Sequence, residues 1–138
     1  MQKEENSLSH SELVCLEEDG EGIEFGAYLR RVRQAKQISI RQLAKSVDKT
    51  AAYLSDIENG NNKPPDKELL EVLIRALDLD EYPRIRENLF DLAAEERNDV
   101  PADIKEYIMH NKMLLKVLRA AKNTPDSEQI WLQMANRV

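Results

Sequence analysis

The sequence is poor in cysteine and aromatic residues and has no long apolar run. Cys15 has no second cysteine to pair with, which excludes an intrachain disulfide and favours a reducing compartment. No stretch approaches the roughly 18–20 apolar residues of a membrane span. The polar, acidic start MQKEENSLSH does not resemble a signal or transit peptide. We therefore expect a cytoplasmic protein without a membrane segment.

Patterns typical of β-strands are also missing. Val, Ile and Thr do not cluster in alternating runs, whereas Leu, Ala, Glu, Lys and Arg are plentiful. This composition predicts an all-α fold. The 138 residues are enough for one compact domain with an appendage.

The negative charge is concentrated at the N-terminus. The net charge is −6, and residues 1–23 contain seven acidic residues and one base, Lys3. Residues 24–80 hold ten basic and nine acidic residues, and residues 81–138 hold nine and ten. Because residues 1–23 also lack a sustained helical period, we expect a disordered acidic tail before a nearly neutral body.

Helical periodicity begins at Glu24 and predicts a helical domain over 24–80 and a helical extension over 81–138. In the domain, the first helix ends near Ala35. The next three helices have Ser39, Thr50 and Asp66 as N-caps. In the extension, helices begin at Pro83, Pro101 and Thr124-Pro125-Asp126, and the apolar face that follows Pro101 continues to about Lys122.

Residues 39–60 have the layout of a helix-turn-helix, in which two short helices are joined by a tight turn and the second ends at a glycine, here Gly60. Ala44 is small where the two helices must cross closely. Thr50 caps the second helix, whose free amides can meet a phosphate. The residues after Thr50 would then project into the major groove of DNA.

The stretch FGAYLRRVRQAKQISIRQLAKSVDKTAAYLSDIENGNNKPP resembles the Cro/CI, or Xre-type, helix-turn-helix family of transcriptional regulators. The residues that carry the resemblance are Leu43-Ala44, Tyr53-Leu54-Ser55, Ile57-Glu58 and Gly60, in this order and at these spacings. The segment DKELLEVLIRALDLDE is similar to the fourth helix of the same family. The resemblance implies a five-helix, lambda-repressor-like domain. It also implies a repressor that binds a two-fold site in double-stranded DNA as a homodimer.

The resemblance further implies which residues contact DNA. They are Ser39, Arg41, Lys49, Thr50, Ala51, Ala52, Tyr53, Ser55, Asp56, Asn59, Asn61, Asn62 and Lys63. Arg33 and Glu58 match a pair that forms a buried ion bridge. Ala51 and Ala52 replace glutamines of many family members and cannot make the bidentate amide contact with adenine. We therefore expect specificity to rest partly on DNA shape and dimer spacing.

The extension is rich in apolar residues for its short helices and predicts a homodimer surface. The residues concerned are Ile104, Ile108, Leu115, Leu118, Ile130, Trp131 and Met134. Two alternatives stay open. These helices could fold back on the domain of the same chain. The protein could also be an interaction module, such as an antitoxin or antirepressor, that binds a protein partner.

Signatures of catalysis and metal binding are missing. His10 and His110 stand alone without further ligands at suitable spacing. Glycine-rich phosphate loops, GxSxG and HExxH are absent from the sequence. The sequence therefore predicts no enzyme, no cofactor, no metal site and no small-molecule ligand.

Overall fold

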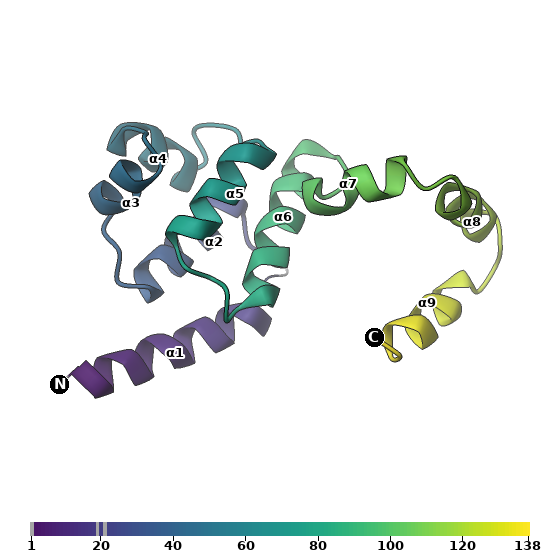
Figure 1. Cartoon of the computed structure of the whole chain (residues 1–138), viewed down its shortest axis with the longest axis horizontal. Helices are drawn as coiled ribbons and strands as arrows, with labels where there is room; N and C mark the ends of the chain where they lie inside the picture. The colour runs from purple at the N-terminus through teal and green to yellow at the C-terminus, as the bar shows by residue number, and fades with distance from the viewer. Residues whose placement is uncertain (1, 19, 21) are drawn as a thin grey trace. The chain divides into compact units, whose positions relative to one another are not determined.

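The computed structural model describes residues 2–18, 20 and 22–138, and every regular element among them is a helix, as expected. The helices (Figure 1) are α1 (Gln2–Glu18), α2 (Phe25–Ala35), α3 (Ile40–Ser46), α4 (Ala51–Glu58), α5 (Lys67–Ala76), α6 (Pro83–Arg97), α7 (Ala102–Met109), α8 (Lys112–Lys122) and α9 (Ser127–Ala135). The chain divides into two compact units, Met1–Asp103 and Ile104–Val138. Among the described residues, no helix is long and apolar enough to cross a membrane.

The three predicted N-caps of α3, α4 and α5 are confirmed. Ser39 forms a capping box in which its hydroxyl accepts from the Gln42 amide at 3.1 Å and the Gln42 side chain accepts from the Ser39 amide at 2.8 Å. The Thr50 hydroxyl accepts from the Tyr53 amide at 3.1 Å, and the Asp66 carboxylate caps α5 in the same way. Each cap satisfies an amide that the helix itself leaves without a partner.

The core of the first unit is formed by α2 to α6 together with the last turns of α1. Its largest fully buried side chains are Phe25, Tyr28, Leu29, Leu43, Leu54, Ile57, Leu70, Leu73, Leu77, Leu79, Ile85 and Leu89. Ile85 and Leu89 belong to α6, which the sequence analysis assigned to the extension. The first compact unit therefore includes α6 and continues to Asp103.

The expected disordered tail is not confirmed, and the structure corrects it to the helix α1. Leu13 and Leu16 are 3% and 7% exposed, and α1 packs on α2 and α6. At its C-terminal end, the Tyr28 hydroxyl donates to the Leu16 carbonyl at 2.8 Å. These contacts bury Leu13 and Leu16 against helices that come later in the chain. The local sequence pattern contains no information about such partners, so it predicted no helix for residues 1–23. Residues 1, 19 and 21 of the expected tail lie outside the described residues.

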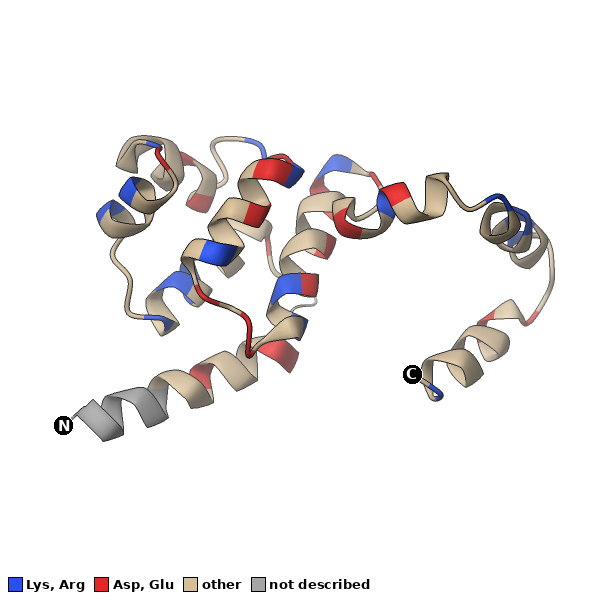
Figure 2. Cartoon of the chain, viewed as in Figure 1, with Lys and Arg blue, Asp and Glu red and all other residues tan. Residues whose placement is uncertain are grey.

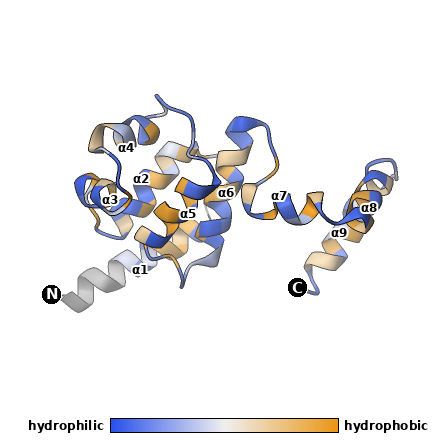
Figure 3. Cartoon of the chain, turned by 45° about the horizontal axis from the view of Figure 1, so that its top comes forward, coloured by the Kyte–Doolittle hydropathy of each residue, from blue (hydrophilic) through white to orange (hydrophobic). Residues whose placement is uncertain are grey.

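The second unit contains α8, α9 and most of α7, and none of its residues is buried. The apolar face after Pro101 is split between two helices, because Asn111 begins α8 by accepting from the Leu114 amide at 2.9 Å. Among the predicted dimer residues, Ile104, Leu118, Ile130 and Met134 are exposed, and Ile108, Leu115 and Trp131 are half-buried. Figure 3 shows hydrophobic positions along α7 and α8.

Candidate nucleic-acid interface

The predicted helix-turn-helix consists of α3, a turn at 47–49, and α4, and the two helices pack on each other. Ala44 is 3% exposed, in agreement with the need for a small residue there. The turn is closed by the Lys49 amide, which donates to the Ala44 carbonyl at 2.9 Å. Asp48 has a φ of 56°, a left-handed conformation that aspartate tolerates better than most residues.

The helix α4 has one buried and one exposed face. Leu54, Ile57 and Glu58 are buried, whereas Ala52, Asp56 and Asn59 lie at i, i+4 and i+7 and are exposed. Among the other predicted contact residues of this segment, Thr50 is exposed and Ala51, Tyr53 and Ser55 are half-buried. Ala51 and Tyr53 pack partly against the core, so the outward stripe narrows to Ala52, Asp56 and Asn59 with Ser55 beside them.

Arg33 and Glu58 form an ion pair between α2 and α4. The Glu58 carboxylate accepts from Arg33 Nη2 at 2.8 Å and from Arg33 Nε at 3.0 Å and 3.2 Å. The Glu58 side chain is 1% exposed and the Arg33 side chain 12%. Arg33 Nη1 also donates to the Ile38 carbonyl at 3.0 Å, which ties the α2–α3 connection to the same guanidinium. The charge-assisted bonds of this pair fix the C-terminal end of α4.

A second arginine, Arg30, joins this cluster and was not predicted as a site residue. Its Nε lies 3.5 Å from the Glu58 carboxylate, and its side chain is 42% exposed. Arg30 Nη2 also donates to the Asn59 side-chain oxygen, while the Asn59 amide donates to the Ser55 hydroxyl at 3.3 Å. Arg30 therefore positions Asn59 and Ser55 on the exposed side of α4. Arg30 lies one helical turn before Arg33, and this spacing in the sequence could have predicted that both arginines approach Glu58.

Gly26 allows α2 and α4 to approach closely, a role that the sequence analysis missed. A Cβ atom at this position would lie 2.2 Å from the Ile57 carbonyl oxygen and 2.6 Å from that of Glu58. Both obstacles are backbone atoms, so a side chain could be accommodated only if the two helices separated. The absence of a side chain at Gly26 thus permits the short distance between α2 and α4.

The loop after α4 presents Asn61, Asn62 and Lys63 to solvent, as the sequence analysis required for a backbone contact. It leaves the helix through Gly60, whose φ of 77° favours glycine, and the Asn61 amide donates to the Asp56 carbonyl at 2.8 Å. Downstream, the Pro64 carbonyl accepts from Arg97 of α6. Hydrogen bonds therefore hold the loop at both of its ends.

Glu96, the residue before Arg97, stabilises the start of α2. Glu96 accepts from the Phe25 amide at 2.9 Å and so caps the first turn of that helix. The C-terminal end of α6 consequently holds both α2 and the loop at 61–63. This role of α6 was not predicted from the sequence.

Positively charged residues lie on α3 and in the turn that follows it, where Figure 2 shows blue positions. Arg41, Lys45, Lys49 and Lys63 are exposed, and Ser39 is exposed at the start of α3. The Lys49 ammonium lies 5.8 Å from the centre of the Tyr53 ring, a cation–π contact. Asp48 and Asp56 are the exposed acidic residues of the motif, and Glu24 and Glu96 border the loop at 61–63. Positive charge therefore predominates along α3 and the following turn, on a chain that is negative overall.

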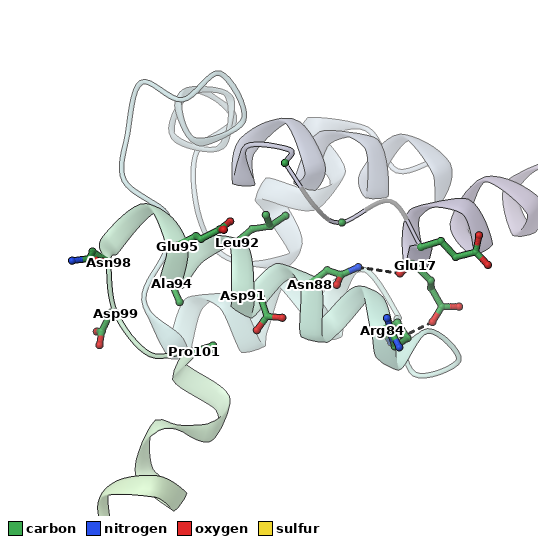
Figure 4. Close-up of a pocket in the computed structure, with 13 residues that line it drawn as sticks. Glu17, Arg84, Asn88, Asp91, Leu92, Ala94, Glu95, Asn98, Asp99 and Pro101 are labelled. Carbon is green, nitrogen blue, oxygen red and sulfur yellow. Dashed lines mark hydrogen bonds between the residues drawn. The ribbon is translucent and has the colours of Figure 1, made fainter. Parts of the chain in front are cut away.

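An acidic cleft of about 790 Å³ lies where α1 meets α6 (Figure 4). The Asn88 amide there donates to the Glu17 carbonyl at 3.3 Å and to the Leu16 carbonyl at 3.4 Å. Asp91 is exposed on this cleft, and partial desolvation by its surroundings, together with the negative charges of Asp103, Glu87 and Glu95, raises the pKa of its carboxyl group. Among the described residues, no group of three or more His, Cys, Asp or Glu could hold a metal ion. The contacts of this cleft attach α1 to α6.

Comparisons with known proteins agree with this geometry. A family model described as a helix-turn-helix domain matches residues 24–84, which contain α2 to α5 and all predicted DNA-contact residues. A curated relative, the ImmF control region 10 kDa protein of Bacillus phage phi105, is 31% identical over 80 residues. The aligned region covers 54% of this chain and 89% of the relative. No solved structure matches the chain significantly.

Proposed function

Because the chain belongs to the helix-turn-helix family of DNA-binding regulators, we propose that it is a sequence-specific, non-enzymatic transcriptional repressor. In this proposal α2 to α6 are the five helices of a lambda-repressor-like, Xre-type domain, and α4 lies in the major groove. The protein acts in the cytoplasm as a dimer on a two-fold operator. The name of the relative, which refers to a phage control region, supports a role in regulation.

The observation that carries the proposal is the exposed stripe of α4. Ala52, Asp56 and Asn59 face solvent in register, while Leu54, Ile57 and the buried ion pair of Glu58 hold the opposite face. A helix held in this way can enter the groove without rearrangement. Asn59 and Ser55 supply hydrogen-bonding groups, Asp56 can accept from a cytosine amine, and Ala52 can contact a thymine methyl group.

Phosphate contacts come from both sides of this stripe. The first amides of α3 and α4, next to the Ser39 and Thr50 caps, can donate to phosphate oxygens. Arg41, Lys49 and Lys63 add positive charge, and the asparagines at 61 and 62 can hydrogen-bond to the DNA backbone. These contacts fix the position of α4 on the duplex.

We assign dimerisation to the second unit. Large apolar side chains such as Tyr107, Met113 and Leu132 are 63–71% exposed there. A second copy would cover such a surface, and two domains about 34 Å apart would read successive half-sites. Sedimentation of the full chain should show a dimer, and Leu118→Asp combined with Ile130→Asp should give a monomer. The exposed apolar Val14 of α1 supplies a control, Val14→Asp, that stays dimeric.

The same exposed apolar residues favour the second candidate function, an interaction module with a protein partner. The two functions differ in sedimentation and in DNA binding. A monomeric wild-type chain that binds no DNA would favour the module. A dimer that binds DNA favours the repressor.

Binding of the full chain to the DNA that flanks its own gene tests the repressor proposal. We expect binding that is at least about a thousandfold tighter than to a random duplex of equal length and that weakens steeply with salt. Lys63→Ala should reduce the salt slope by about one unit, because it removes one phosphate contact. Arg75→Ala, which removes an exposed charge from α5, should leave the slope unchanged.

A further inference from the structure

The second unit has a charge opposite to that of the first. Residues 104–138 contain six Lys or Arg and three Asp or Glu, whereas residues 1–103 contain fourteen and twenty-three. The unit that carries the helix-turn-helix is therefore strongly negative as a whole, and its overall field opposes the approach of DNA. The second unit, residues 104–138, has by contrast an excess of basic over acidic residues.

Within the second unit, the basic residues are concentrated on α8. This helix contains Lys112, Lys116, Arg119 and Lys122 and no acidic residue. Lys112, Lys116 and Arg119 lie at i, i+4 and i+7 and so share one face of the helix. Figure 2 shows the blue positions gathered on α8. We call these three residues the basic face of α8.

The basic face has no partner among the residues that the structure describes. All three side chains are exposed, and none forms a hydrogen bond or an ion pair with a described residue. Like charges at these spacings repel each other and destabilise a helix. Only Arg119 and Lys122, in the last turn, gain from the helix dipole. An anionic surface would relieve this repulsion.

We propose that the basic face of α8 binds the phosphate backbone of double-stranded DNA, as a second contact independent of sequence. Its three charges span about 10 Å along the helix axis, over which one DNA strand presents about three phosphates. The inference rests on the proposed function, because α4 brings the same duplex to the chain and raises its effective concentration at α8. The apolar residues of α8, such as Met113 and Val117, lie on another face and remain free for the dimer contact.

The test compares two full-length variants with equal changes in net charge. The first combines Lys112→Gln, Lys116→Gln and Arg119→Gln, which keep helix propensity. The control combines Arg75→Gln, Arg84→Gln and Arg137→Gln, three exposed residues outside both proposed DNA surfaces. The salt dependence of binding is measured for the specific duplex and for a random duplex, and circular dichroism verifies the helix content of each variant.

We expect the α8 variant to lower the salt slope by about 2 to 3 units and to weaken binding to both duplexes by the same factor. The control variant should change the slope by less than about half a unit. Equal slopes in the two variants, with a wild-type chain that binds DNA, would overturn the α8 contact and leave the proposed function intact. A wild-type chain that binds neither duplex would instead overturn the proposed function.

A membrane is the competing anionic surface, and vesicles of phosphatidylglycerol provide its test. Binding of the wild-type chain to these vesicles that is lost in the α8 variant, together with an unchanged DNA slope, would assign the basic face to lipid and overturn the inference. No binding to the vesicles, together with the reduced DNA slope, would support it.

Discussion

The carboxylate of Glu58 lies between two arginines of α2, Arg33 at 2.8 Å and Arg30 at 3.5 Å, while its own side chain is only 1% exposed. One helix thus neutralises the buried charge at the end of the proposed recognition helix. The same cluster reaches the surface through Arg30 and Asn59. Stability and the shape of the proposed DNA-binding surface are therefore coupled through a single buried carboxylate.

Arg33→Met should lower the free energy of unfolding by about 3 kcal/mol, because it leaves the buried Glu58 with the more distant Arg30 as its remaining cation. Urea denaturation followed by circular dichroism measures the change. Arg31→Met, an exposed neighbour on the same helix, should stay within about 0.5 kcal/mol of the wild type. Equal midpoints for the two variants would refute the structural importance of the pair.

Gly26→Ala should destabilise the protein, although the same exchange in a free helix stabilises by about 0.5–1 kcal/mol. The new methyl group would collide with the Ile57 carbonyl, and we expect a net loss of about 2 kcal/mol. Thermal unfolding shows whether the variant is less or more stable than the wild type. Gln34→Ala, at an exposed position of α2, is the matched control and should leave stability nearly unchanged. A stabilised Gly26→Ala variant would mean that α2 and α4 are not in close contact.

Asn88→Ala should loosen α1, because its amide donates to two carbonyls in the last turn of that helix and to the Tyr28 hydroxyl at 3.1 Å. Hydrogen exchange of residues 9–18 should become faster, with little change in α3 and α4. Glu87→Ala, an exposed neighbour on α6, should leave the exchange of α1 as it is in the wild type. Unchanged protection of α1 in Asn88→Ala would show that Asn88 does not hold the helix.

Asp91→Asn should stabilise the protein near pH 7. The folded state raises the pKa of Asp91 above its ordinary value of 3.8, so ionisation at neutral pH opposes folding. Well below pH 3.8 the carboxyl is protonated in both states, and the advantage of the variant should fade there. Melting temperatures near pH 7 and well below pH 3.8 measure this gain in stability, with Asp80→Asn, at another exposed position, as the control. A gain that is equal at both pH values would contradict the assigned cause.

Much of the domain could be predicted from the sequence because its signals are local. Ser39, Thr50 and Asp66 cap the helices that they were expected to cap, since a cap involves residues only three apart. The motif spacing around Leu43-Ala44 and Gly60 likewise depends on the segment itself. The resemblance to the Cro/CI-type regulators is confirmed by the family match and the phage relative.

The features that were missed depend on distant partners. The helix α1 is held by Tyr28 and Asn88, which lie on α2 and α6. The need for glycine at position 26 arises from carbonyls of α4, more than thirty residues away. Local periodicity carries no information about such contacts. The division between α7 and α8 was missed for another reason, since Asn111 is a weaker marker of a helix start than the proline at 101.

The most direct test of the central claim is selection of binding sites from a library of randomised duplexes by the full-length protein. We expect one enriched, two-fold symmetric sequence with half-sites about 34–36 Å apart, or one turn of DNA. Substitution of Asp56 by asparagine, on the exposed stripe of α4, should change the preferred base at symmetric positions and leave the spacing unchanged. Recovery of no common sequence by the wild-type chain, or of the same sequence by the variant, would contradict the claim that α4 reads DNA.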